Sequence, residues 1–181
     1  MIIQLRSERS GDRALISRIV RRAFWEAPHT GHNEVAVVLG LRQAGALSLS
    51  LLLEAEGQAV GYVAVSPVTL SDGSPGWYGI GPVAILPEWQ RQGLGSTLME
   101  KVLEALSSSS SLDARGVVLL GDPAFYTRFG FRPVPGLTLP GFPEAYFMAR
   151  VLRGEIPSAT VAYHAAFEAP EGSDPPEALD G

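Results

Sequence analysis

Apolar residues recur at helical spacing in three parts of the chain. Between residues 12 and 25 they occupy positions i, i+1, i+4, i+5, i+8 and i+9, which only a helix places on one face. A second helix is expected from about Glu34 to Gln43, ahead of Gly45, and a third from Leu94 to about Leu106. The members of the first stripe are Leu15, Ile16, Ile19, Val20, Ala23 and Phe24.

Short apolar runs between these helices predict strands. Leucines alternate with mostly polar residues over residues 47–53, and residues 59–70 are rich in side chains that favour strands. Together they predict an antiparallel hairpin. The runs at 83–86 and 116–120 flank the third helix, and we expect them to be parallel neighbours joined by a right-handed crossover. Further strands are expected at residues 2–6, 144–152 and 160–167. The pattern predicts a mixed α/β fold.

The length of 181 residues favours a single domain that is large enough to bury a core. We expect this domain at residues 1–167. Residues 169–181 contain four acids and three prolines with almost no apolar side chains. Such a composition cannot bury enough surface to order a chain, so residues 168–181 are predicted to be an acidic, disordered tail.

The net charge of −5 is unevenly distributed. Six of the 19 acidic residues lie from Glu155 onward, where there is no Lys or Arg, so residues 1–153 carry 14 basic and 13 acidic residues. This nearly neutral body does not predict a nucleic-acid partner. The chain has no cysteine, which excludes disulfides and thiolate sites and fits a cytoplasmic enzyme. No apolar run approaches the ~20 residues of a membrane span.

A glycine-rich loop joins the 83–86 strand to the third helix, and it reads Gly93-Leu94-Gly95. The first N–H groups of a helix have no internal acceptor, and the peptide dipoles add partial positive charge there, so the loop is typical of a phosphate site. Residues 79–84 match a dinucleotide fingerprint by chance, because they lead into a strand and not into a helix. The single lysine, Lys101, lies inside the helix, which excludes a P-loop.

The wider motif around this loop resembles the acetyl-CoA signature of the GCN5-related N-acetyltransferase (GNAT) superfamily. It reads Val83-Ala84-Ile85-Leu86-Pro87-Glu88-x-Gln90-x-x-Gly93-Leu94-Gly95. Downstream, Tyr126-x-x-x-Gly130-Phe131 resembles the second hallmark of the superfamily, and the resemblance spans roughly residues 2–167. It is especially close to predicted acetyltransferases with Gly-Pro-Val-Ala and Gly-Asp-Pro-x-x-Tyr motifs. It implies a mixed sheet of about six to seven strands with a splay between the fourth and fifth, flanked by about four helices.

The resemblance also assigns residues to acetyl-CoA. The N–H groups of Arg91 through Ser96 are expected to surround its pyrophosphate, and the main chain of Val83, Ala84 and Ile85 to pair with its pantetheine arm. Pro82 fits that pairing, because proline cannot donate inside a sheet and marks an opened edge. The full cofactor set is Val83, Ala84, Ile85, Gln90, Arg91, Gln92, Gly93, Leu94, Gly95, Ser96 and Phe125.

Tyr126 occupies the position where the superfamily keeps its general acid. A phenol beside the sulfur can protonate or hydrogen-bond the departing thiolate, although a thiol pKa near ~8.5 makes that help modest. The alternative is that Tyr126 is aromatic core together with Phe125, Phe129 and Phe131. We favour function for the tyrosine and core packing for the three phenylalanines.

The general base is not fixed by the sequence. Some relatives carry a glutamate on the cofactor strand where this chain has Gly79. The candidates left open are Glu34, His29, His32 and Glu88. The two histidines lack a third ligand nearby, so no metal is expected.

The sequence therefore predicts an N-acetyltransferase that moves an acetyl group from acetyl-CoA to a primary amine of a small molecule or peptide, by direct attack in a ternary complex. The acceptor is expected to meet loops at residues 27–33, 71–76 and 134–143. A monomer or homodimer is expected. The alternatives are a non-catalytic acyl-CoA sensor or interaction module, and a plain nucleotide-binding domain.

Overall fold

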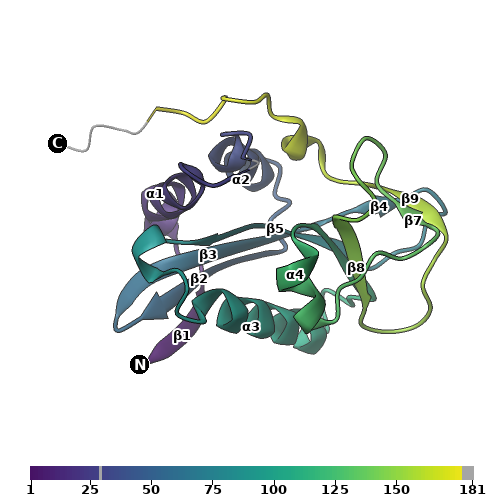
Figure 1. Cartoon of the computed structure of the whole chain (residues 1–181), viewed down its shortest axis with the longest axis horizontal. Coiled ribbons are helices and arrows are strands. Elements are labelled where there is room, and N and C mark those ends of the chain that lie inside the picture. The colour runs from purple at the N-terminus through teal and green to yellow at the C-terminus, as the bar shows by residue number, and fades with distance from the viewer. Residues whose placement is uncertain (29, 177–181) are drawn as a thin grey trace. The chain divides into compact units, whose positions relative to one another are not determined.

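The structure is a computed structural model that describes residues 1–28 and 30–176 (Figure 1). Two helices in succession follow the first strand, a hairpin follows them, and a helix then separates two further strands, as the apolar pattern predicts. Their bounds are β1 Ile3–Ser7, α1 Arg13–Phe24, α2 Glu34–Gln43, β2 Leu49–Ala55, β3 Gln58–Pro67, β4 Thr69–Leu70, β5 Trp77–Ile85, α3 Leu94–Ser108, β6 Gly116–Leu120, α4 Pro123–Tyr126, β7 Leu137–Thr138, β8 Phe147–Val151 and β9 Ala159–Ala162.

The main sheet has six strands in the order β1-β2-β3-β5-β6-β8. The chain forms two compact units, and β3 and β5 contribute one part of their length to each. The first unit consists of Met1–Ala64, Pro82–Leu98 and the segment from Ala165 onward; the second consists of Val65–Gly81 and Met99–His164. We describe each unit by itself.

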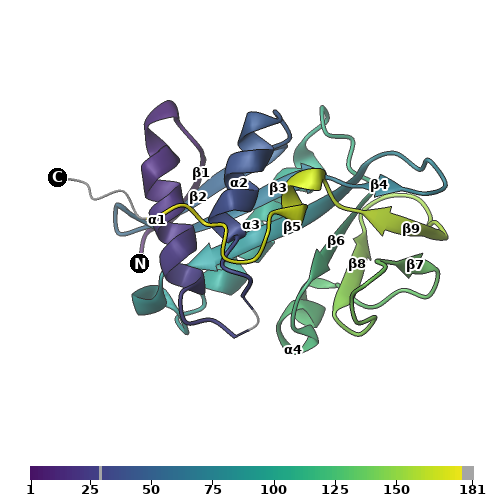
Figure 2. The ribbon, with the colours of Figure 1, turned by 90° about the horizontal axis from the view of Figure 1, so that it is seen from above.

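In the first unit, α1 and α2 lie together on one face of the β1–β3 part of the sheet (Figures 1 and 2). β1 and β2 pair antiparallel, from Ile3 with Ala55 to Ser7 with Leu51. The α1 stripe is buried as its spacing predicts, with Ile16, Ile19 and Val20 at most 1% exposed. The stripe meets residues of α2, β2 and β3 in one hydrophobic cluster. Burial of this stripe is what holds α1 on the sheet.

In the second unit, β6 is paired on both sides. It runs antiparallel to β8 from Gly116 with Val151 to Leu120 with Phe147, and parallel to β5. The sequence analysis missed a second sheet with the order β4-β9-β7. Its strands β4 and β7 have two residues each, too short to show any period, and β7 lies in the Pro/Gly-rich stretch expected to be a loop.

The fourth and fifth strands of the main sheet, β5 and β6, pair over three residues only. The parallel register runs from Trp77 with Gly116 to Gly79 with Val118, although β5 continues to Ile85. Gly81 then adopts a φ of 149°, which L side chains rarely adopt, and Pro82 has no N–H to donate. The predicted splay between the fourth and fifth strands is confirmed, with Gly81-Pro82 in the unpaired part.

Other element ends differ from the prediction. β5 begins at Trp77, well before the expected residue 83, and β8 begins at Phe147 and not at residue 144. The last expected strand, 160–167, was too long: β9 ends at Ala162, and a short 3-10 turn follows at Ala165–Glu168. Strand ends of this kind depend on partner strands more than on local sequence.

Part of the expected tail, within residues 168–176, makes hydrogen bonds to the loop between α1 and α2. The Gly172 N–H donates to the Gly31 carbonyl at 2.8 Å, and the Asp174 N–H donates to the His32 carbonyl at 3.1 Å. Composition alone does not predict these polar contacts. Residues 177–181 of the expected tail lie outside the described residues.

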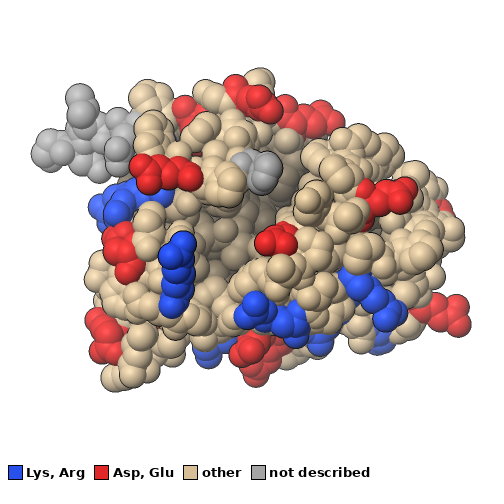
Figure 3. Space-filling view, viewed as in Figure 1, with Lys and Arg blue, Asp and Glu red and all other residues tan. Residues whose placement is uncertain are grey.

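On the face drawn in Figure 3, basic and acidic side chains are interspersed. Across the described residues, no helix is long and apolar enough to cross a membrane.

An ion pair fixes the start of the first unit. Arg6 binds Asp12 through Nη1 and Oδ2 at 2.7 Å and binds Glu54 through Nε and Oε1 at 2.6 Å. Asp12 occupies the N-cap position of α1, but its carboxylate makes no cap hydrogen bond and instead accepts from Arg6 and from the Arg9 N–H. These hydrogen bonds, that of Arg6 first, lower the pKa of Asp12 from 3.8 to about 2.

We predict that Asp12→Asn lowers the free energy of unfolding at pH 7 by about 1–3 kcal/mol, the range for a lost hydrogen bond to a charged group. The folded-state pKa lies below the unfolded one, so this stability is present above about pH 4 and is lost as the pH falls toward 2. Urea titrations at pH 7 and pH 3 should show the gap between wild type and variant narrowing. The control is Glu100→Gln, an exposed acid on α3; an equal loss there would contradict the assignment.

Candidate functional site

The loop between β5 and α3 is held by its own side chains. Gln90 donates from Nε2 to the Ile85 carbonyl at 2.9 Å, and Gln92 donates from Nε2 to the Glu88 carbonyl at 3.2 Å. Arg91 and Gly93 both have positive φ, 61° and 80°, which turns the chain sharply into the helix. The Gln90 amide is therefore occupied in shaping the loop, a role that the sequence analysis did not foresee.

This geometry leaves a row of main-chain N–H groups without acceptors. The Thr97 N–H bonds back to the Gly93 carbonyl at 3.1 Å, and α3 begins at Leu94. Ahead of Thr97, the N–H groups of residues 91–96 have no oxygen acceptor among the described residues. The Leu94 side chain is buried in the core, 1% exposed, so this residue offers a ligand only its main chain. Such a row at the start of a long helix is an anion-binding geometry.

A pocket of about 530 Å³ borders the loop. Arg22 crosses beside it and binds both oxygens of Glu88, each at 2.9 Å. The Arg91 side chain is exposed and has no hydrogen-bond partner among the described residues, so its charge is available to a ligand. The lining residues are Arg22, Ala23, Trp25, Glu26, Ala27, Pro28, Pro87, Gln90 and Arg91.

The three β5 residues expected to pair with pantetheine differ in exposure. Ala84 is 1% exposed and Ile85 is 8% exposed, and both pack into the first unit. A Cβ added at Gly61 would lie 2.7 Å from the end of Ile85, so that glycine makes room for the isoleucine. Val83 is partly exposed. The side chains of Ala84 and Ile85 belong to the core, so a ligand could meet these two residues only through their main chain.

Tyr126 lies at the end of α4, in the second unit. Asp122 caps this short helix by accepting the Ala124 N–H at 2.9 Å. A Cβ added at Gly121 would lie 2.3 Å from the Tyr126 ring, so the ring rests directly on the glycine backbone. Its hydroxyl makes no hydrogen bond within the described part of the chain. Burial raises the pKa of Tyr126 to about 12, which keeps the phenol protonated at neutral pH.

Core packing is predicted for all three phenylalanines around Tyr126, and two of them are core. Phe129 and Phe131 are 7% and 1% exposed, which confirms them as core. Phe125 is partly exposed; its ring meets Tyr126 edge-on at 4.9 Å and lies under the Arg128 guanidinium at 5.1 Å. Its role at a cofactor stays a prediction.

The candidate general bases differ in the contacts that their side chains make. Glu34 Oε1 accepts from the Thr30 hydroxyl, while its Oε2 is buried with no partner among the described residues. Glu88 is bound to Arg22, and hydrogen bonds from its own backbone and from Arg22 lower its pKa, which makes it a poorer base. The His32 ring packs edge-on against Trp25 at 5.8 Å. His29 lies outside the described residues.

The missing glutamate at position 79 has a steric explanation. A Cβ on Gly79 would lie 2.5 Å from the Tyr163 ring, so any side chain there would displace the tyrosine. This contact joins β5 to the stretch after β9, and no local pattern in the sequence predicts it. Among the described residues, no group of three His, Cys, Asp or Glu could hold a metal ion.

Comparisons with known proteins agree with this geometry. The family model of the acetyltransferase (GNAT) domain matches residues 47–133. N-acetyltransferase YhbS of Escherichia coli (strain K12) is 35% identical over 159 residues, or 84% of this chain and 90% of that protein. A GNAT family acetyltransferase from Brucella melitensis in complex with acetyl-CoA has a TM-score of 0.79 and 39% identity over 92% of this chain and 98% of its own. The E. coli YhbS structure in complex with CoA has a TM-score of 0.79 and 33% identity over 92% of each chain.

We predict that Gly121→Ala destabilises the protein by about 1–3 kcal/mol, because the new methyl group would overlap the Tyr126 ring. Thermal melts should show a lower midpoint. The matched control is Gly11→Ala, where a Cβ meets nothing within 4 Å. Equal melting of the two variants would show that Tyr126 does not rest on Gly121.

Proposed function

Since the chain belongs to the GNAT acetyltransferase family, we propose that it transfers the acetyl group of acetyl-CoA to a primary amine by direct attack in a ternary complex. The observation that carries this proposal is the row of unpaired N–H groups at residues 91–96. A pyrophosphate supplies the acceptors that these groups lack, and the α3 dipole favours its charge. The relatives solved with acetyl-CoA and with CoA support the choice of ligand.

The proposed cofactor contacts use the N–H groups, the charge and the ring edge that these residues offer to a ligand. Residues 91–96 offer their N–H groups and Arg91 its charge to the phosphates. The main chain of residues 83–85 offers hydrogen bonds to the amides of pantetheine, as an added strand would. Gln90 supports these contacts by holding the loop to Ile85. Phe125 offers an apolar ring edge to the cofactor.

The proposed chemistry uses two side chains. The acceptor ammonium loses a proton to a base, for which Glu34 is the candidate because its Oε2 has no partner within the described chain. The amine nitrogen then bonds to the acetyl carbon, the carbon–sulfur bond breaks, and the second proton that the nitrogen loses replaces the one that Tyr126 gives to the sulfur. The Tyr126 hydroxyl hydrogen-bonds the leaving sulfur and gives it a proton. With a pKa of about 12 it is a weaker acid than a thiol, so its contribution is moderate.

The first test of this function is Tyr126→Phe. We expect kcat to fall by about tenfold to a hundredfold, the value of one hydrogen bond to a developing charge, with the Kd of acetyl-CoA unchanged. Thiol release with a panel of amines gives kcat, and calorimetry gives Kd. The matched control is Tyr146→Phe, an exposed tyrosine that should change neither quantity. Equal turnover of Tyr126→Phe and wild type would remove the acid role.

The second test concerns the row of main-chain N–H groups at residues 91–96. Gly93→Val should raise the Kd of acetyl-CoA at least about a hundredfold, because it adds a branched side chain at a φ of 80° in the loop that approaches the phosphates. Gly57→Val is the control, since Gly57 has a φ of 77° in the β2–β3 turn and pays the same backbone strain. An unchanged Kd of acetyl-CoA in Gly93→Val would contradict phosphate binding by the N–H groups of residues 91–96. Cofactor binding without thiol release from any amine would favour a non-catalytic acyl-CoA sensor.

A further inference from the structure

The segment at residues 169–176, which we call the C-terminal strap, is fastened to the first unit by polar contacts. Figure 2 shows it crossing α1 and α2. Asn33 donates from Nδ2 to the Ala169 carbonyl at 2.8 Å, and Arg21 donates from Nη2 to the Pro175 carbonyl. Together with the main-chain bonds of Gly172 and Asp174, these contacts run along the length of the strap. The strap is therefore a built part of the surface around α1 and α2.

Asp174 of the strap caps α2. Its Oδ1 accepts the Ala36 N–H at 2.8 Å, in the first turn of the helix. Asn33, at the N-cap position, makes no side-chain cap of its own. A carboxylate at this place is stabilised by the helix dipole. Its second oxygen, Oδ2, receives no hydrogen bond from the residues that the structure describes.

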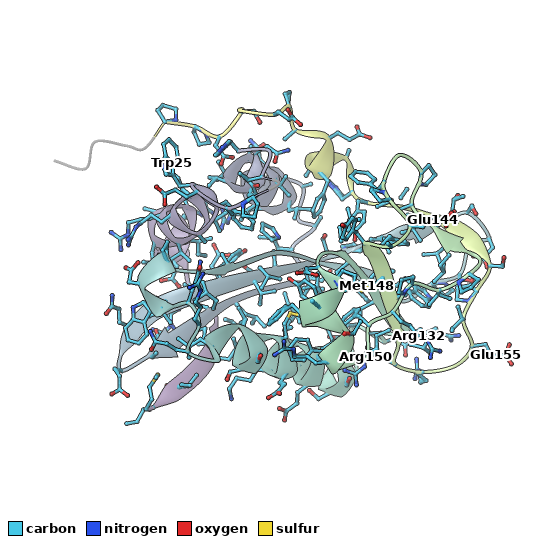
Figure 4. The ribbon with its side chains drawn as sticks, viewed as in Figure 1. Trp25, Arg132, Glu144, Met148, Arg150 and Glu155 are labelled. Carbon is cyan, nitrogen blue, oxygen red and sulfur yellow. The ribbon has the colours of Figure 1, made fainter. Side chains whose placement is uncertain are left out.

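The strap, α1 and the start of α2 enclose a pocket of about 310 Å³. Its apolar lining includes Phe24, Trp25 and Pro175. Trp25 is 67% exposed, and Figure 4 shows it beside the C-terminal segment. The volume lies at the small end for ligand pockets and suits a small molecule.

The charged groups in this pocket favour a cation. It contains the carboxylates of Glu34 and Asp174, the guanidinium of Arg21 and the ring of His32. Arg21 already donates a hydrogen bond to the strap, and the His32 ring packs against Trp25. Glu34 Oε2 is buried and receives no hydrogen bond from the described residues, which is costly unless a ligand supplies an N–H. Aromatic faces next to carboxylates are a typical environment for an organic ammonium group.

We propose that this pocket binds the ammonium group of a small organic amine with an aromatic or apolar skeleton. Glu34 and Asp174 receive the ammonium hydrogens, and the Trp25 ring lies against the skeleton. The proposal deepens the proposed function and rests on it only where it identifies this amine as the acetyl acceptor. Binding itself requires no transfer, so the two can fail separately.

Calorimetry on the full chain tests the pocket with three probes of one shape: 2-phenylethylamine as the ammonium, 2-phenylethanol as its neutral analogue and 3-phenylpropionate as an anion. We expect the ammonium to bind at least about tenfold more tightly than the other two. Equal binding of the alcohol would overturn the proposal.

Two variants remove charge while keeping the shape. Asp174→Asn retains an oxygen for the Ala36 N–H, and Glu34→Gln retains one for Thr30, so the thermal midpoint should change little. Each should weaken binding of 2-phenylethylamine by about tenfold. The control is Asp72→Asn, an exposed acid of the second unit that accepts the Ser74 N–H at 2.9 Å. Unchanged binding in both pocket variants would overturn the proposal.

Turnover separates this proposal from the proposed function. If 2-phenylethylamine binds but no thiol is released from acetyl-CoA, the pocket is supported and the transferase assignment to this amine fails. If acetyl transfer occurs and Asp174→Asn leaves the KM of the amine unchanged, the transferase stands and the pocket is overturned. A raised KM with kcat retained in Asp174→Asn supports both.

Discussion

The main-chain N–H groups of residues 91–96 need acceptors that the described chain does not supply, and much of the sequence around them follows from that constraint. Gly93 provides the positive φ that turns the groups outward, Gln90 and Gln92 tie the loop to carbonyls behind it, and Leu94 anchors the helix start in the core. The main effect of each of these residues is to orient the N–H groups, and not to contact a ligand with its own side chain. A helix of this length adds a dipole in the same direction.

Glycines play a second role, as surfaces on which aromatic rings rest. Tyr126 lies on Gly121, Tyr163 on Gly79 and Trp77 on Gly116, each with a ring atom within about 2.5 Å of where a Cβ would stand. In each pair the absence of a side chain fixes the position of a large ring. Tyr126 thereby has a fixed place although its hydroxyl makes no hydrogen bond to the described residues.

The sequence was most informative where the chemistry is local. The α1 stripe and the start of α3 at Leu94, directly after Gly93, each follow from residues a few positions apart, and both are found as predicted. The small sheet of β4, β9 and β7 escaped prediction because two-residue strands have no period. The contacts of residues 168–176 escaped prediction as well, because they are hydrogen bonds to Gly31, His32 and Ala36 and not apolar burial. The contact of Gly79 with Tyr163 is long-range, so the sequence could show the missing glutamate and not its cause.

Residues near the end of the described chain, in the strap, form hydrogen bonds with α1 and α2. Asp174 supplies the cap that α2 lacks locally, and the same carboxylate faces the pocket beside Glu34. In the proposed pocket the cap uses Oδ1 of Asp174, so an ammonium group bound by Oδ2 would not compete with the cap. A negative charge at this end of α2 is favourable without a ligand because of the helix dipole. The pocket can therefore hold two carboxylates close together in the free protein, as recognition of a cationic amine requires.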